Sequence, residues 1–158
     1  MMEPAELRES CAAALLAALP KASGLRAFVG LDGFVDEIVH LVDKRTDAYS
    51  YDRIRTITQL SERIAAAAGR STNIEPVTQQ IKLGGNGPIM ANALAQLGCK
   101  VTYLGALGHP VIHPVFEEFT EVAEVHSIAE SGHTDAMEFD DGKVMLTKTV
   151  QLNEITWD

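Results

Sequence analysis

Residues 82–108, KLGGNGPIMANALAQLGCKVTYLGALG, decide the fold of this 158-residue chain. An extended run ends in the pair Gly84-Gly85, the helical pattern PIMANALAQL follows, and Gly98 precedes a second apolar run. Proline in the first turn of a helix and glycine just beyond its last turn are common helix boundaries. The stretch therefore predicts a strand, a glycine turn, a helix starting near Pro88 and a second strand.

The glycine turn has two interpretations. Glycines let the backbone come close to a ligand, and the helix start presents unpaired N–H groups and a positive dipole end. Such a turn binds anions or hydroxyl groups, and Asn86 would cap the helix or reach the ligand through its amide. No Gly-Lys-Ser/Thr follows, and Met90 stands where a dinucleotide-binding motif has its third glycine, so neither phosphate motif fits. The alternative is a turn whose glycines serve only the backbone.

Strand and helix patterns alternate on both sides of this stretch, over residues 28–128. That order predicts an α/β fold with a mainly parallel sheet. A hairpin at residues 134–150 and extended runs around residues 36–50 and 77–83 do not fit the alternation. We expect these strands to stand off the main sheet as a flap.

Two further helices are expected outside the quoted stretch. Residues 53–69 carry an amphipathic stripe that includes Ile54. Near the N-terminus, the apolar run at residues 11–19 follows acidic residues, and it is far shorter than the roughly 20 apolar residues that cross a bilayer. We therefore interpret residues 1–24 as a helix, ended with the help of Pro20, and a linker.

The composition is that of an acidic globular protein, with a formal net charge of -9, 46% hydrophobic residues and 22% charged residues. An acidic surface repels nucleic acid and anionic membranes, so neither is an expected partner. Cys11 and Cys99 have no paired or metal-ligand spacing, which favours a reduced, cytoplasmic setting. His109 and His113 are flanked by prolines and have no third ligand nearby, so we expect no metal site.

Three segments, taken in order, resemble the ribokinase/PfkB family of carbohydrate kinases. The glycine pair, its Ala-rich helix and VTYLGALG resemble the family's first signature; VGLDGFVDEIVHLV resembles its opening strand, and TDAMEFDDGKVMLTKT resembles strands of its sugar-covering lid. The resemblance implies a ribokinase-like α/β fold, with a mainly parallel sheet flanked by helices and a small β lid. Residues 25–158 would be the N-terminal part of such a domain, including lid strands, with an incomplete second half.

The resemblance also implies where a sugar binds. In that family an aspartate after the first strand accepts hydrogen bonds from sugar hydroxyls, and the glycine pair packs its backbone against the sugar. Asp36 is the matching aspartate and Asp32 is its competitor, because one extended strand would separate them by about 13 Å, too far to serve the same hydroxyls. The implied substrate-binding residues are Asp36, Gly84, Gly85, Asn86 and Asp32.

One departure from the family pattern affects this site. The family has an asparagine in the early helix, five residues after the first glycine of the pair, and here that position is Ile89. Asn86 lies nearer the glycines and Asn92 lies about one helical turn later, so either is a candidate replacement. The particular sugar therefore stays open.

The resemblance implies that this chain is the substrate-binding portion of an ATP-dependent kinase that phosphorylates a sugar hydroxyl. The family's ATP site and catalytic aspartate lie beyond the hairpin, and no Gly-Ala-Gly-Asp segment occurs here. We therefore expect ATP and Mg²⁺ to serve a full-length relative, and this chain to bind neither well and to carry no catalytic residue. A homodimer through lid strands is a further expectation.

Two other functions compete with this interpretation. One is a non-catalytic module that binds a small polyol or another protein and lacks transferase activity. The other is a Rossmann-like nucleotide-binding domain, which the poor match of the glycines to a dinucleotide motif disfavours.

Overall fold

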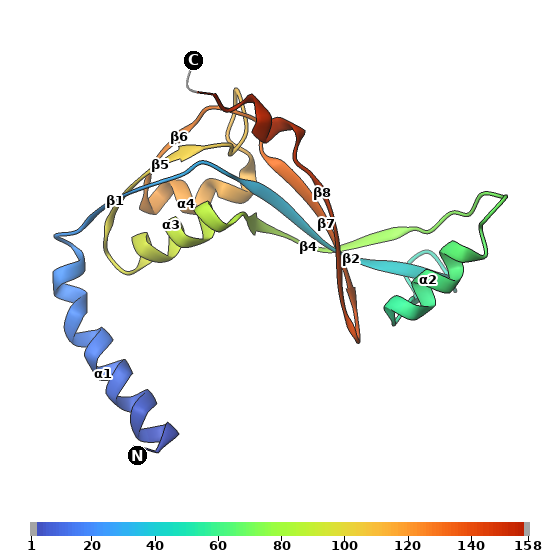
Figure 1. The fold of residues 1–158 in the computed structure, drawn as a ribbon, viewed down its shortest axis with the longest axis horizontal. Coiled ribbons are helices and arrows are strands. Elements are labelled where there is room, and N and C mark those ends of the chain that lie inside the picture. Colours follow the sequence, from blue (N-terminus) through green and yellow to red (C-terminus); the bar gives the residue numbers. More distant parts are fainter. Residues whose placement is uncertain (1–2, 157–158) are drawn as a thin grey trace.

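The structure, a computed structural model, describes residues 3–156, which form two sheets and four α-helices (Figure 1). The strands are β1 (Arg26–Val29), β2 (Phe34–Arg45), β3 (Tyr51–Arg53), β4 (Pro76–Gly84), β5 (Lys100–Gly105), β6 (Glu124–Ser127), β7 (Gly132–Phe139) and β8 (Gly142–Lys148). The helices are α1 (Pro4–Ala22), α2 (Ile57–Ala65), α3 (Asn86–Gln96) and α4 (Glu117–Val122), with short 3-10 turns η1 (Pro114–Phe116) and η2 (Val150–Glu154).

The smaller sheet is parallel, in the order β1-β5-β6, and helices α3 and α4 lie on one of its faces (Figure 1). Tyr103 of β5 is fully buried under these helices, and its ring meets that of Phe119 edge-on, with 5.4 Å between centroids. Edge-to-face contact is a favoured aromatic geometry. On the other face Phe28 is 70% exposed. The sheet was expected to be flanked by helices, and the described helices cover only one of its faces.

The larger sheet is the flap expected from the sequence, and we call strands β2, β3, β4, β7 and β8 the lid (Figure 1). Strand β2 is central: it pairs in parallel with β7 and antiparallel with β4 and β3. The lid has its own core beneath α2, made by Val39, Leu41, Ile54, Leu60, Met137 and Phe139. The expected α/β class with a lid is confirmed, although the five-stranded lid is larger than the parallel sheet instead of small.

Helix α2 is shorter than the sequence pattern predicted. Its first turn is capped by Thr56, whose hydroxyl accepts the N–H of Gln59 at 3.1 Å, while the Gln59 side chain accepts the N–H of Thr56 at 3.2 Å. This reciprocal capping box fixes a helix start. Ile54 therefore lies outside the helix, and it is buried in the lid core instead of lying on a helical stripe.

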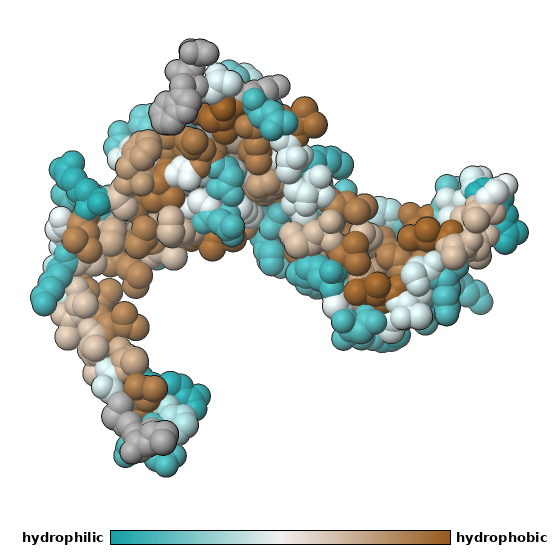
Figure 2. Space-filling view, in the orientation of Figure 1, coloured by the Kyte–Doolittle hydropathy of each residue, from teal (hydrophilic) through white to brown (hydrophobic). Residues whose placement is uncertain are grey.

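Helix α1 extends away from both sheets and has no buried residue (Figure 1). Its apolar side chains face solvent (Figure 2), and four leucines are 40% to 67% exposed: Leu7, Leu15, Leu16 and Leu19. Pro20 lies inside the helix, which continues to Ala22, so it does not end the helix as predicted. Among the described residues, no helix is long and apolar enough to cross a membrane.

Replacing Leu60 with alanine tests whether α2 is anchored by the lid core. Leu60 is 7% exposed, and we expect Leu60→Ala to lower the free energy of unfolding by about 2–3 kcal/mol, because it leaves a cavity. Ile64 of the same helix is 56% exposed, so Ile64→Ala serves as the control, with a loss below about 1 kcal/mol. Urea unfolding followed by circular dichroism measures both, and equal losses would contradict the assignment.

Candidate functional site

The glycine turn joins the end of β4 to the start of α3 and is closed by Asp32. Gly85 has a φ of 91°, a conformation that glycine adopts without strain. The Asp32 carboxylate accepts the N–H of Asn86 at 3.0 Å and that of Gly87 at 2.9 Å. A negative side chain at these two orphan donors stabilises the helix start. Asp32 therefore caps α3 from the segment between β1 and β2.

Close packing around Asp32 explains the glycines of the turn. A Cβ atom added at Gly85 would lie 3.0 Å from the Asp32 carboxylate, and one added at Gly87 would collide with it. The Tyr103 hydroxyl also donates a hydrogen bond to the main-chain carbonyl of Asp32. Burial raises the pKa of Tyr103 far above its usual range, and the nearby Asp32 charge adds to this, so the phenol remains a donor. The buried Tyr103 of β5 thus supports the residue that caps the helix.

Asp36 lies on the other side of the same turn. Its carboxylate is so near Gly84 that a Cβ atom there would collide with it. Within residues 3–156, no group donates a hydrogen bond to this carboxylate, and it is half-buried. Thr134, which is 2% exposed, faces Asp36 in register on β7. A half-buried carboxylate without an internal donor is suited to accept hydrogen bonds from a ligand.

The structure brings together all five residues predicted as substrate contacts. The chain between β1 and β2 bends instead of forming one extended strand, so Asp32 and Asp36 both lie against the glycine pair. Asn86 is exposed at the helix start and donates its backbone N–H to Asp32. Asn92 instead lines a different depression, with Lys82 and Glu118 as neighbours.

Two residues of this arrangement were not singled out from the sequence. Tyr103 holds the backbone of Asp32, and Thr134 lies beside Asp36 across the β2–β7 pair. Tyr103 falls in an apolar run that predicted only a buried strand, and Thr134 carries no local signal. Their positions depend on pairing between segments that are distant in sequence.

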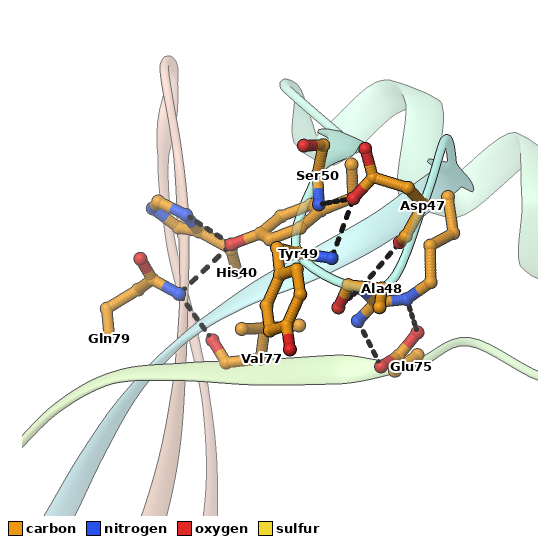
Figure 3. Close-up of polar contacts among 10 residues, drawn as sticks. His40, Asp47, Ala48, Tyr49, Ser50, Glu75, Val77 and Gln79 are labelled. Carbon is orange, nitrogen blue, oxygen red and sulfur yellow. Dashed lines mark hydrogen bonds and ion pairs between the residues drawn. The ribbon is translucent and has the colours of Figure 1, made fainter.

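Polar contacts fix the turn at the far end of the lid (Figure 3). Arg45 binds the Glu75 carboxylate with two nitrogens, at 2.6 and 3.1 Å, and also donates to the carbonyl of Ala48 at 2.9 Å. The Asp47 carboxylate accepts the N–H groups of Tyr49 and Ser50, each at 2.8 Å. A bidentate arginine–carboxylate pair restricts geometry more than a single contact does. The β2–β3 turn is therefore held to Glu75, the residue just before β4.

His40 lies on the same face of β2 as Asp36, farther toward the lid tip, because alternate residues of a strand share a face. Arg53 contacts the His40 Nε2 atom at 2.9 Å. On the other side of the ring, Gln79 donates to the Tyr51 hydroxyl at 3.1 Å (Figure 3). Burial lowers the pKa of His40, and the Arg53 charge lowers it further, while Glu138 and Asp140 partly offset this. His40 is thus held as a neutral acceptor for Arg53.

One group of three potential metal ligands lies elsewhere on the lid. Glu37, His133 and Asp135 place one ligand atom each within 4.8 Å of the others. Glu37 follows Asp36 on β2, so the group lies on the opposite face of the strand. It is separate from the glycine turn.

A glycine turn at a helix start, an aspartate beside it and a β lid are the features expected of a ribokinase-type sugar kinase. The prokaryotic ketohexokinase family model matches residues 5–158, and the chain belongs to that family. The ketohexokinase of Haloferax volcanii is 32% identical over 139 residues, which cover 87% of this chain and 37% of that protein. The chain therefore spans little more than a third of this relative's length.

Two ribokinase structures are also similar. One is the ribokinase of Cryptococcus neoformans in complex with ADP, with a TM-score of 0.49 and 16% identity, covering 85% of this chain and 37% of that one. The other is the Arabidopsis thaliana ribokinase complexed with ribose and ATP, with a TM-score of 0.44 and 14% identity, covering 82% of this chain and 36% of that one.

The helix cap predicts the effect of removing the Asp32 carboxylate. We expect Asp32→Ala to lower the free energy of unfolding by about 1–2 kcal/mol, because two N–H groups at the start of α3 lose their acceptor. Urea unfolding gives this value. Asp52, exposed on β3, supplies the control Asp52→Ala, and a loss no greater for Asp32→Ala than for this control would argue against the cap.

The lowered pKa of His40 predicts a pH dependence of stability. Its pKa in the folded chain is below the ordinary 6.5, so the unfolded chain binds the proton more readily. The stabilisation is present above pH 6.5 and is lost as the pH falls toward the folded pKa. Urea unfolding measures the free energy of unfolding at pH 7 and at pH 5. This free energy should fall less between the two pH values in His40→Gln than in the wild type, whereas His126→Gln, at an exposed site, should behave as the wild type.

Proposed function

We propose that this chain is the substrate-binding portion of an ATP-dependent kinase that phosphorylates a hydroxyl group of a ketohexose. The observation that carries the proposal is the Asp36 carboxylate, which lies against Gly84 and has no hydrogen-bond donor among residues 3–156. Family membership and the printed activity of the Haloferax volcanii relative support the substrate class.

In this proposal the two aspartates have different tasks. Asp36 accepts hydrogen bonds from ligand hydroxyls, since its carboxylate has no other donor among the described residues. Asp32 positions the turn, because both of its carboxylate oxygens already accept backbone N–H groups. Gly84 and Gly85 let the ligand approach the backbone, and the exposed Asn86 offers an amide at the rim.

Phosphoryl transfer also requires groups that this chain does not provide in a recognised motif. The migrating phosphoryl group needs charge stabilisation, and the attacking hydroxyl needs a base or a positioning group. We propose that residues 1–24 are an N-terminal helix and linker, and that residues 25–158 are the N-terminal part of a ribokinase-like domain. ATP, Mg²⁺ and the catalytic aspartate then act in the remainder of a full-length relative.

The proposal includes a homodimer formed through the lids. A mainly apolar groove beside α2 is lined by Val39, Leu41, Leu60, Ile64, Ile74, Pro76, Met137, Val144 and Leu146, with Asp135 as its one charged residue, and apolar side chains gather on this part of the lid (Figure 2). Strand β8 is an edge of the sheet and exposes Met145. A second lid would cover both features.

The two free cysteines, Cys11 and Cys99, fit the reducing cytoplasm that we propose as the setting.

Sugar binding by the Asp36 site is tested by calorimetry. We titrate fructose into the 158-residue chain, or into a longer natural protein that contains it, and compare Asp36→Asn with the control Asp52→Asn. Loss of hydrogen bonds to a charged carboxylate should weaken binding by roughly tenfold to a hundredfold in Asp36→Asn alone. Gly84→Ala should weaken it as well, because its Cβ displaces the carboxylate.

Fructose binding that is unchanged in Asp36→Asn would rule out the site assignment. Binding without phosphate transfer from ATP by the longer protein would favour the non-catalytic polyol-binding module. Tight binding of NAD would instead favour a Rossmann-like nucleotide-binding domain.

A further inference from the structure

A cluster of three potential metal ligands lies on the face of the lid opposite Asp36, and we call it the Glu37–His133–Asp135 cluster. The His133 Nε2 atom lies 3.1 Å from Asp135 Oδ1 and 3.7 Å from Glu37 Oε1. All three side chains are half-buried, with exposed fractions of 28% to 34%. None of them takes part in the glycine turn.

Strand pairing fixes these three residues with respect to one another. Glu37 of β2 is directly opposite Asp135 of β7 in the parallel register, and His133 lies two residues earlier on β7. Residues at i and i+2 of a strand share a face, so all three side chains point to the same side. Val39 and Met137, which lie two residues farther along the same strands and on the same face, belong to the lid core. The ligand atoms are therefore carried by two central strands and not by a loop.

The charges of the cluster do not balance within it. Two carboxylates converge on one ring nitrogen, which carries at most one proton, and only Asp135 Oδ1 lies within hydrogen-bond distance of it, because Glu37 Oε1 is 3.7 Å away. A tetrahedral Zn²⁺ ion with nitrogen and oxygen ligands at about 2.0–2.2 Å separates neighbouring ligand atoms by about 3.3–3.6 Å. The distances of 3.1 and 3.7 Å bracket that range.

The neighbours of the cluster leave the ligand atoms available. Lys148 contacts Asp135 through the other oxygen, Oδ2, at 3.3 Å, and its side chain is 64% exposed. An exposed pair of this kind contributes little stability, so the lysine can move away at small cost. Thr78 donates to Glu37 Oε2 at 3.1 Å and so orients that carboxylate while leaving Oε1 free. Such supporting hydrogen bonds are typical around metal ligands.

We propose that Glu37, His133 and Asp135 bind a divalent transition-metal ion of the Zn²⁺ type. One imidazole and two carboxylates form a ligand set that suits Zn²⁺, and a fourth position remains for water. The ion would link β2 to β7 directly behind Asp36, so it would stabilise the lid sheet and take no part in phosphoryl transfer. The proposal is independent of the proposed sugar-kinase function.

Calorimetric titration with ZnCl₂ at pH 7 tests this site in the full 158-residue chain. The wild type should bind one equivalent, and Co²⁺ should give a visible absorption spectrum typical of low coordination number. We expect Glu37→Gln, His133→Gln and Asp135→Asn each to weaken Zn²⁺ binding by roughly tenfold or more, because each removes a ligand. His126→Gln is the matched control, since His126 contacts one carboxylate, that of Glu124, at 3.3 Å in the other sheet.

Thermal unfolding supplies a second measurement. Zn²⁺ should raise the Tm of the wild type and of His126→Gln, but not that of His133→Gln, because an ion that binds only the folded chain stabilises it. Glu37→Gln and Asp135→Asn keep the shapes of the side chains, so they remain informative if His133→Gln unfolds. No saturable Zn²⁺ binding by the wild type, or equal binding by all variants, would overturn the proposal.

Discussion

The hydrogen bonds from the start of α3 to the Asp32 carboxylate connect the parallel sheet, the glycine turn and the lid. Asp32 belongs to the bend between the parallel sheet and the lid, Tyr103 holds its backbone from β5, and its carboxylate holds the glycine turn at the end of β4. The space for this arrangement is small, because a Cβ atom at Gly33 would collide with the Ala106 carbonyl and one at Gly87 with Asp32 itself. The bend, the turn and the helix therefore depend on one another.

The side chains of strand β2 differ in kind between the two faces of the lid. One face carries Asp36 beside the turn and His40 farther out, and the other carries Glu37 followed by the apolar residues of the lid core. Alternation along the strand keeps the two sets apart although they are adjacent in sequence. A single strand can thus present a polar binding surface on one side and anchor α2 on the other.

Much of this arrangement was predictable from the sequence, for reasons that are local. Gly84 ends β4, Pro88 lies in the first turn of α3, which begins two residues earlier at Asn86, and Gly98 follows the end of that helix, all through backbone preferences. The family resemblance placed Asp36 at the turn. The role of Asp32 was not predictable, because its partners Asn86 and Gly87 are more than fifty residues away. Ile54 was misplaced for a different reason: the capping box of Thr56 and Gln59 is a local helix start that the apolar stripe obscured, and only the burial of Ile54 in the lid core depends on distant segments. The convergence of Glu37 and His133 depends on the β2–β7 register, which no short motif encodes.

The described residues form two hydrophobic cores. One core lies between the parallel sheet and helices α3 and α4 and includes Val35 from the near end of β2, and the other lies between the lid and α2. Regions with separate cores can open independently, and amide hydrogen exchange reports such partial opening. A ligand held between Asp36 and the glycine turn would touch both regions at their junction, so binding would slow exchange in both and make them open together. Occupancy of the turn would in this way convert a two-part molecule into a single folding unit.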